Sequence, residues 1–186
     1  ENGSPAFATP LEELGFGDLG SAEFRVVSQD PREVLFERTQ SGVTIRKRFV
    51  FDEESYRFRL GVEIANGAEA DISPGFGVVL PAQVQPGSDF RELTIAALVQ
   101  GSVERELIAS FGQSGGIGAM FGRTPEPQRD FAGEIDWSGA YSHYFVTALI
   151  PDVARDARVR WVAVRPGEET LVTMSQPPVS VPTGTA

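Results

Sequence analysis

The sequence predicts an all-β fold, a twisted β-sandwich with little helix. Apolar residues alternate with polar ones over several runs, which is the period of a half-buried strand. Gly, Pro and an Asn-Gly pair separate these runs and supply turns. No segment shows the amphipathic period of a helix of three turns or more. Many short strands divided by turns are typical of a sandwich or a barrel.

The clearest predicted element is a long β-hairpin. In "VTIRKRFVF" (43–51), Lys47 is the single exception on an apolar face, and "YRFRLGVEI" (56–64) alternates without exception. The residues "DEES" between the two runs suit a turn. With "DEES" as the turn, Phe51 pairs with Tyr56, and that pair sets the register of the whole hairpin.

Further strands are predicted on both sides of this hairpin, as apolar or alternating runs bounded by turn residues. The stretch "YFVTALIP" (144–151) lacks polar alternation, which predicts a strand buried on both faces. The predicted runs are "FRVVS" (24–28), "EVLFERT" (33–39), "FGVVL" (76–80), "LTIAALVQ" (93–100), "VERELIASF" (103–111), "HYFVTALI" (143–150), "VRWVAV" (159–164) and "ETLVTM" (169–174).

The predicted domain organisation has three parts. Residues 1–22 form an irregular lead-in, residues 23–175 the β-sandwich, and residues 176–186 a Pro-rich linker. A length of 186 residues suits one ordinary domain. Because the chain starts at Glu1 rather than Met, we expect an excised piece of a longer protein.

Composition excludes several classes of function. The formal net charge is −10, from 26 acids against 16 bases, which argues against nucleic acid as a partner and against binding to anionic lipid. The absence of cysteine excludes disulfides, thiolate catalysis and cysteine zinc sites. No apolar run approaches the ~20 residues of a membrane helix. We expect a monomer that does not bind membranes when isolated.

The segment "GQSGG" (112–116) matches the G-x-S-x-G nucleophile elbow of serine hydrolases. Asp130 or Asp136 and then His143 follow Ser114 in the order that such hydrolases use. The elbow requires a helix after the serine, and the glycines of "GIGAMFG" disfavour one. A phosphate loop is excluded because its G-x-x-x-x-G-K-[ST] pattern is not met. A hydrolase built on Ser114 is therefore kept only as an alternative.

A metal site is not expected either. His143 is the single histidine, whereas catalytic metal sites usually draw on two or three. The acids of "FDEES", including Glu53 and Glu54, lack the spacing of a calcium loop. No catalytic, cofactor-binding or metal-binding residue is thus predicted, and no cofactor.

Aromatic residues gather in "DWSGAYSHYFVTALIP" (136–151), which holds one of two tryptophans and two of three tyrosines. Trp and Tyr carry a large apolar area with one polar group each. The preferred interpretation is that this cluster packs the sheets of the sandwich. The alternative is a ligand cleft lined by aromatic side chains.

This aromatic segment resembles the signature of the periplasmic domain of YidC-type membrane protein insertases. The matching positions are Trp137, Tyr144, Phe145, Ala148, Ile150 and Pro151. Upstream, "RKRFVFDEESYRFRLGVEIANGAEADI" resembles the family's charged strand, acidic turn and long second strand. Downstream, "VRPGEET" resembles its Pro-Gly-Glu step. The resemblance spans roughly Thr44 to Glu169, and the membrane core of the insertase is absent from this sequence.

The resemblance implies a twisted β-supersandwich, similar to galactose-mutarotase-like domains, in the periplasmic part of a bacterial inner-membrane protein. It implies a non-enzymatic scaffold that contacts Sec translocon components and nascent membrane proteins. Trp137, Tyr144, Phe145 and Pro151 would be structural residues. Fold similarity does not carry sugar chemistry with it. The first alternative is a carbohydrate- or peptide-binding β-sandwich module.

The outer face of the predicted hairpin carries four arginines: Arg46, Arg48, Arg57 and Arg59. In the predicted register Arg48 faces Arg59, and like charges directly opposite destabilise a sheet. The first explanation is that acids of the preceding strand, Glu33 and Glu37, lie between them. The second is that the arginines form a docking patch for an acidic partner segment.

Overall fold

The computed structural model describes residues 6–9, 14, 22–84, 93–113, 126–154 and 156–185. These residues form twelve β-strands in three four-stranded sheets, and every strand pair is antiparallel. The predicted all-β class, a sandwich with little helix, is confirmed.

The chain divides into two compact units. We call them the sandwich unit, Glu1–Pro10 with Phe76–Pro177, and the single-sheet unit, Leu11–Gly75 with Pro178–Ala186. The step from Gly75 to Phe76 falls inside the range predicted as one sandwich domain. Each unit is described by itself below.

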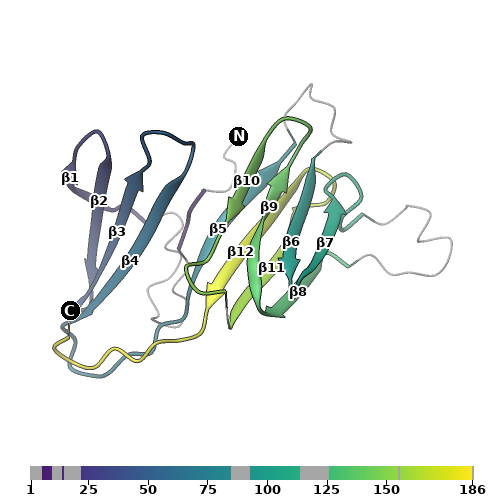
Figure 1. Cartoon of the computed structure of the whole chain (residues 1–186). Helices are drawn as coiled ribbons and strands as arrows, with labels where there is room; N and C mark the ends of the chain where they lie inside the picture. Colours follow the sequence, from purple (N-terminus) through teal and green to yellow (C-terminus); the bar gives the residue numbers. More distant parts are fainter. Residues whose placement is uncertain are drawn as a thin grey trace. The chain divides into compact units, whose positions relative to one another are not determined.

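The sandwich unit contains two sheets with strand orders β10-β9-β6-β7 and β5-β12-β11-β8 (Figure 1). The first sheet combines two hairpins, β6–β7 and β9–β10, through the β6–β9 pair, and in the second sheet β5 reaches β12 across most of the unit. The strands are β5 (Phe76–Gln83), β6 (Thr94–Val99), β7 (Ser102–Leu107), β8 (Gln128–Gly133), β9 (Ile135–Tyr141), β10 (Val146–Leu149), β11 (Ala157–Arg165) and β12 (Glu169–Gln176).

The core of the sandwich unit centres on Trp161 of β11, which is fully buried. Alternation along β11 turns Val159, Trp161 and Ala163 inward, while Arg158 and Arg160 point outward. Ile95 of β6 and Ile135 of β9 belong to the same buried cluster, so side chains of both sheets fill one core. Such a two-sided core is what holds a sandwich together.

The single-sheet unit contains β1 (Arg25–Gln29), β2 (Glu33–Gln40), β3 (Val43–Phe51) and β4 (Phe58–Asn66), in that order across the sheet. One face is apolar, with the rings of Phe36, Phe49, Phe51 and Phe58 in a chain of contacts at centroid distances of 5.8–5.9 Å. The opposite face carries most of the charged residues, as the period-two pattern predicts, while Lys47 and Arg38 lie on the apolar face.

The hairpin of β3 and β4 confirms both predicted strands, but the predicted register is wrong. Phe51 pairs with Phe58 rather than with Tyr56. Arg48 consequently faces Gly61, and Arg59 faces Val50. A shift by an even number of residues keeps each side chain on its predicted face, so only the cross-strand partners change.

The cause of this register lies in the loop, which comprises residues 52–57 rather than "DEES" alone. The Asp52 amide donates to the Arg57 carbonyl at 3.0 Å and closes the loop. The Asp52 carboxylate accepts hydrogen bonds from the Glu54 amide at 3.0 Å and from the Ser55 hydroxyl at 2.8 Å. These local bonds favour a wider loop over a tight turn.

The C-terminal tail, predicted as a linker, is extended and hydrogen-bonded to the single-sheet unit. The amides of Ile72 and Val181 donate to each other's carbonyls, and the Asn66 amide donates to the Thr185 carbonyl. The buried Asn66 side chain donates to the carbonyls of Ala70 and Val181, both at 2.9 Å. Asn66 therefore fastens the tail to the end of β4.

Candidate functional site

No metal-binding constellation forms among the residues that the structure describes. They contain no group of three or more His, Asp or Glu side chains placed to hold a metal ion. Ser114 lies outside the described residues. The Asp130 carboxylate accepts hydrogen bonds from Arg160 and Gln128, both at 2.6 Å, and the bond from Arg160 lowers the pKa of Asp130. Asp130 is thus engaged in an ion pair on the surface of the sheet.

The aromatic segment forms the β9–β10 hairpin at the edge of its sheet. The Ser142 amide donates to the Phe145 carbonyl at 2.8 Å, which closes the turn, and His143 and Tyr144 form its tip. Gly139 lets the two strands approach closely, because a Cβ at this position would lie 2.6 Å from the Ala148 Cα. No other residue type fits such a contact without moving β10.

The prediction that this cluster packs between the sheets is wrong. Tyr144 is 87% exposed and Phe145 79% exposed, while Trp137 and Pro151 are half-buried. The prediction that "YFVTALIP" is buried on both faces is also wrong. Its strand is β10, an edge strand, and the residues before it form the hairpin tip. A tip has no second sheet to cover it.

Trp137 lies on the outer face because of a β-bulge. Leu98 of β6 pairs with Trp137 and Val99 pairs with Ile135, so Asp136 is an extra residue in β9. The bulge reverses the alternation, which leaves Ile135 in the core and turns Trp137 away from it. The predicted strands also omitted β8 and β9, because Asp, Ser and Gly interrupt their hydrophobic pattern.

The outer face of the sheet β10-β9-β6-β7 is largely apolar. Along its four strands, side chains that point toward the core alternate with side chains that form the outer face. Arg105 is the one charged residue among the strand positions of this outer face. Exposed members are Val103 at 60%, Leu107 at 45% and Val146 at 69%. The remaining large members, half-buried, are Leu98, Trp137 and Tyr141. An apolar sheet face whose large side chains reach solvent is a candidate interaction surface.

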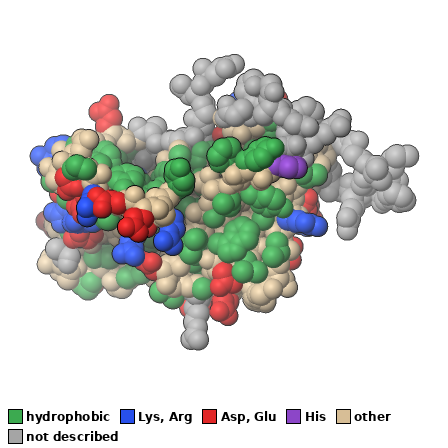
Figure 2. Space-filling view, turned by 45° about the horizontal axis from the view of Figure 1, so that its top comes forward, with side chains coloured by type: hydrophobic (Ala, Val, Ile, Leu, Met, Phe, Trp, Pro, Cys, Tyr) green, Lys and Arg blue, Asp and Glu red, His purple; other side chains and the backbone are tan. Residues whose placement is uncertain are grey.

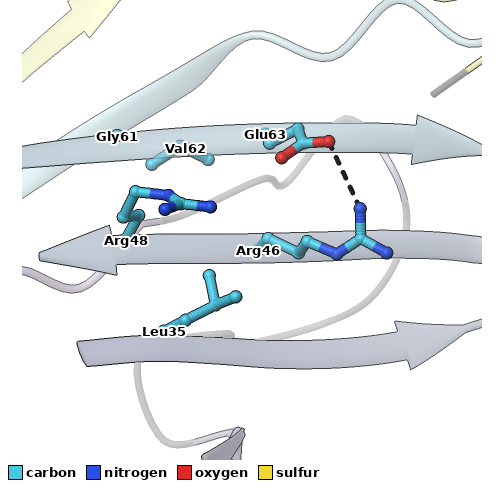
Figure 3. Close-up of a pocket in the computed structure, with 6 residues that line it drawn as sticks. All are labelled: Leu35, Arg46, Arg48, Gly61, Val62 and Glu63. Carbon is cyan, nitrogen blue, oxygen red and sulfur yellow. Dashed lines mark hydrogen bonds and ion pairs between the residues drawn. The ribbon is translucent and has the colours of Figure 1, made fainter. Parts of the chain in front are cut away.

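The charged face of the single-sheet unit joins arginines to glutamates on neighbouring strands. Arg46 donates to Glu37 at 2.9 Å and to Glu63 at 3.3 Å, and Arg48 donates to Glu33 at 2.7 Å. Figure 3 shows Arg46 reaching toward Glu63 while Arg48 lies over Gly61. Glu33 and Glu37, the acids predicted to lie among the arginines, therefore bond to the two arginines of β3 and not to Arg57 or Arg59.

The two remaining arginines of the predicted patch differ from these. Arg57 is in the loop rather than in β4, and it contacts the Asp52 carboxylate at 3.5 Å. Arg59 is exposed on β4, and no ion pair of Arg59 is found in the described part of the chain.

The hydrogen bond from Arg46, together with that from Arg25, lowers the pKa of Glu37, so this acid stays charged.

Lys47 is a buried charge that the sequence marked only as an exception on an apolar face. Its side chain is 8% exposed, and its ammonium lies 4.4 Å from the ring centroid of Phe24. Burial lowers the pKa of Lys47 to about 8. The ring supplies partial compensation through a cation–π contact, while the two residues opposite, Phe36 and Val62, are apolar.

These features define the class of protein: an antiparallel β-sandwich domain with an uncharged, exposed hairpin and an apolar outer sheet face. The described residues contain no helix with the length and hydropathy of a membrane span. The family model of the YidC periplasmic domain matches residues 20–186, so the chain belongs to this family. It is accordingly a periplasmic domain of an inner-membrane protein.

Two relatives carry the name membrane protein insertase YidC. The protein of Anaeromyxobacter sp. (strain Fw109-5) is 27% identical over 154 residues, covering 77% of this chain and 26% of the relative. The protein of Anaeromyxobacter dehalogenans (strain 2CP-1) is 27% identical over 132 residues, covering 70% of this chain and 22% of the relative. The chain thus spans about a quarter of the length of the relatives it matches.

Proposed function

We propose that this chain is a non-catalytic domain of a membrane protein insertase, which contacts nascent membrane proteins and Sec translocon components in the periplasm. The family match and the names of the relatives support this function. The observation that carries it is the outer face of the sheet β10-β9-β6-β7, where Val103, Leu107 and Val146 are exposed. Such a face would bind apolar segments of a nascent membrane protein and shield them from water.

The test is photo-crosslinking in the longer insertase that carries this domain. A photoreactive side chain at Val103 or Leu107 should crosslink to a nascent membrane protein during insertion. The matched control is Val164 of β11, which is 42% exposed but belongs to the other sheet of the same unit. Equal crosslinking from Val164, or none from Val103 and Leu107, would contradict the proposal.

The alternatives predict other results. A carbohydrate- or peptide-binding module would bind defined ligands on a glycan or peptide array without any insertase partner. A hydrolase would react with an active-site serine probe and lose that reaction in Ser114→Ala. We expect neither outcome.

A second contact is proposed for the charged face of the single-sheet unit. The strands carry more positive than negative side chains on this face. The arginines are Arg25, Arg46, Arg48 and Arg59, and the glutamates are Glu33, Glu37 and Glu63. The observation that favours docking is Arg59, exposed and without an ion pair among the described residues. Beside it, a shallow hollow of about 140 Å³ lies over Gly61 and is lined by Arg46 and Arg48. An acidic segment of a translocon component would suit this face, because arginine binds carboxylates in a two-pronged geometry.

A further inference from the structure

The β9–β10 hairpin differs from the rest of the chain in charge. Residues 137–151 contain no Asp, Glu, Lys or Arg, although charged residues make up 23% of the sequence. His143 is the one titratable base in this stretch. An exposed segment without charged side chains can enter an apolar phase, because no charge has to be removed from water.

The hairpin holds its apolar side chains out into solvent. Large hydrophobic residues follow one another along the tip and the chain beyond it, with exposures of 87% for Tyr144, 79% for Phe145, 69% for Val146, 71% for Ile150 and 61% for Val153. In Figure 2, hydrophobic side chains lie beside the chain's single histidine. The Ser142–Phe145 hydrogen bond and the close contact at Gly139 fix the base of this hairpin.

A second hairpin of the chain shows what such a tip looks like when it is adapted to water. The β3–β4 loop also exposes an aromatic residue, Tyr56, completely. Its neighbours in the loop are charged: Asp52, Glu53, Glu54 and Arg57. Four charges would have to be desolvated before Tyr56 could enter an apolar phase, so this loop is confined to water.

We infer that the β9–β10 tip docks into the interface of a lipid bilayer, with Tyr144 and Phe145 entering first. The domain belongs to an inner-membrane protein, so a bilayer surface borders its compartment. Aromatic side chains favour the membrane interface, where the ring lies near the acyl chains and a polar group stays hydrated. A protruding tip has no walls to enclose a peptide, whereas a bilayer surrounds it from all sides.

The lipid in question is uncharged. The tip offers no cation to anionic headgroups, and the chain's net charge of −10 opposes adsorption to them. Docking to uncharged lipid therefore departs from the expectation that the isolated domain does not bind membranes, and it keeps that expectation only for anionic vesicles. Docking to the bilayer rests on the periplasmic, inner-membrane location of the family. It does not depend on the proposed contacts with nascent chains or the translocon, so the docking can hold if those contacts fail, and the reverse.

The experiment uses the 186-residue chain and vesicles of phosphatidylcholine, measured by flotation over a range of lipid concentrations. Binding should be weak, because even one acyl anchor gives an association constant of only about 10⁴ M⁻¹. The double variant Tyr144→Ser/Phe145→Ser should lower the partition coefficient about tenfold or more. The matched control Tyr56→Ser, which also removes an exposed tip aromatic, should leave the coefficient unchanged.

The depth to which the tip enters the bilayer is measured independently with the variant Phe145→Trp and, as its control, Tyr56→Trp. Phospholipids brominated on their acyl chains should quench the added fluorescence of Phe145→Trp and leave that of Tyr56→Trp unchanged. The three exchanged side chains, Tyr56, Tyr144 and Phe145, are all exposed, and urea unfolding of each variant checks that the fold is kept.

Several results would overturn the inference. Undetectable partition of the wild-type chain at millimolar phosphatidylcholine would do so, as would equal partition of the wild type and the double variant. Binding restricted to anionic vesicles would assign the contact to another surface. Capture of an apolar peptide by the tip, with no partition to vesicles, would replace the bilayer by a protein partner.

Discussion

The indole Nε1 of Trp161 donates a hydrogen bond of 3.1 Å to the Ser138 hydroxyl, and this bond joins the two sheets of the sandwich unit. Ser138 in turn donates to the Ala96 carbonyl at 3.0 Å. Both side chains are fully buried, and a buried polar group is costly without a hydrogen-bond partner, so the indole N–H and the serine hydroxyl stabilise each other. Phe131 packs against the same ring at a centroid distance of 4.7 Å. The contact makes Trp161, and not Trp137, the central tryptophan of the fold.

The first prediction compares the two tryptophans. Trp161→Ala should lower the free energy of unfolding by about 3–5 kcal/mol, because it leaves a large cavity between the sheets. Trp137→Ala should cost only about 1–2 kcal/mol, since that side chain is only partly buried and lies on the outer face of the sheet. Urea denaturation measures both. If Trp161→Ala does not fold, Trp161→Phe, which removes the hydrogen bond to Ser138, serves in its place.

The second prediction concerns Gly139. The change Gly139→Ala should destabilise the sandwich unit by about 2–3 kcal/mol, because the added methyl group overlaps the β10 backbone. Proteolysis should then cut the β9–β10 hairpin faster. Gly61→Ala is the control, since its Cβ would lie an ordinary 4.0 Å from the Arg48 Cβ. Equal effects of the two changes would show that strand propensity, and not the close approach, is responsible.

The third prediction is a pH dependence at Lys47. Burial lowers its pKa from the ordinary value of 10.5 to about 8, so the folded chain binds fewer protons than the unfolded chain between these values. Stability should therefore rise with pH across this window. Lys47→Met should be more stable than the wild type below pH 8, by at most about 3 kcal/mol. This difference should shrink as the pH approaches 10.5. A constant difference from pH 7 to pH 10 would show that Lys47 is not desolvated.

The fourth prediction tests how Asn66 fastens the tail. Asn66→Ala removes the donors to the Ala70 and Val181 carbonyls and should cost about 2–3 kcal/mol. Hydrogen exchange should accelerate at the amides of Ile72, Val181 and Gly184, which bond across this junction. Unchanged protection at these three amides would mean that the backbone bonds hold the tail without the side chain.

The fifth prediction separates the two roles of the charged face. The double change Arg48→Gln/Arg59→Gln removes one exposed ion pair, to Glu33, and should alter stability by less than about 1 kcal/mol. Capture of an acidic translocon segment should fall, with a smaller effect at high salt. A loss of stability without any loss of capture would leave the arginines with a purely structural role.

The sequence by itself determined the all-β class, because period two and turn residues are local properties that each strand carries alone. It also determined which side of the β3–β4 hairpin carries most of its charges, and that Glu33 and Glu37 of the preceding strand lie beside the arginines of β3. Face assignment survives a register error of two residues, since parity is unchanged. The alternation of Val159 and Trp161 with Arg158 and Arg160 was a usable signal for the core as well.

Only the tertiary structure decided the register and the place of the aromatic residues. The register depends on hydrogen bonds that Asp52 makes within its loop, and a pattern of apolar residues does not contain them. The bulge at Asp136 turns Trp137 outward, and the edge position of β10 leaves Tyr144 and Phe145 in solvent. Burial is a property of what lies opposite a side chain. An apolar strand inside a sheet and one at its edge can therefore look alike in sequence, although only the first has neighbours on both sides.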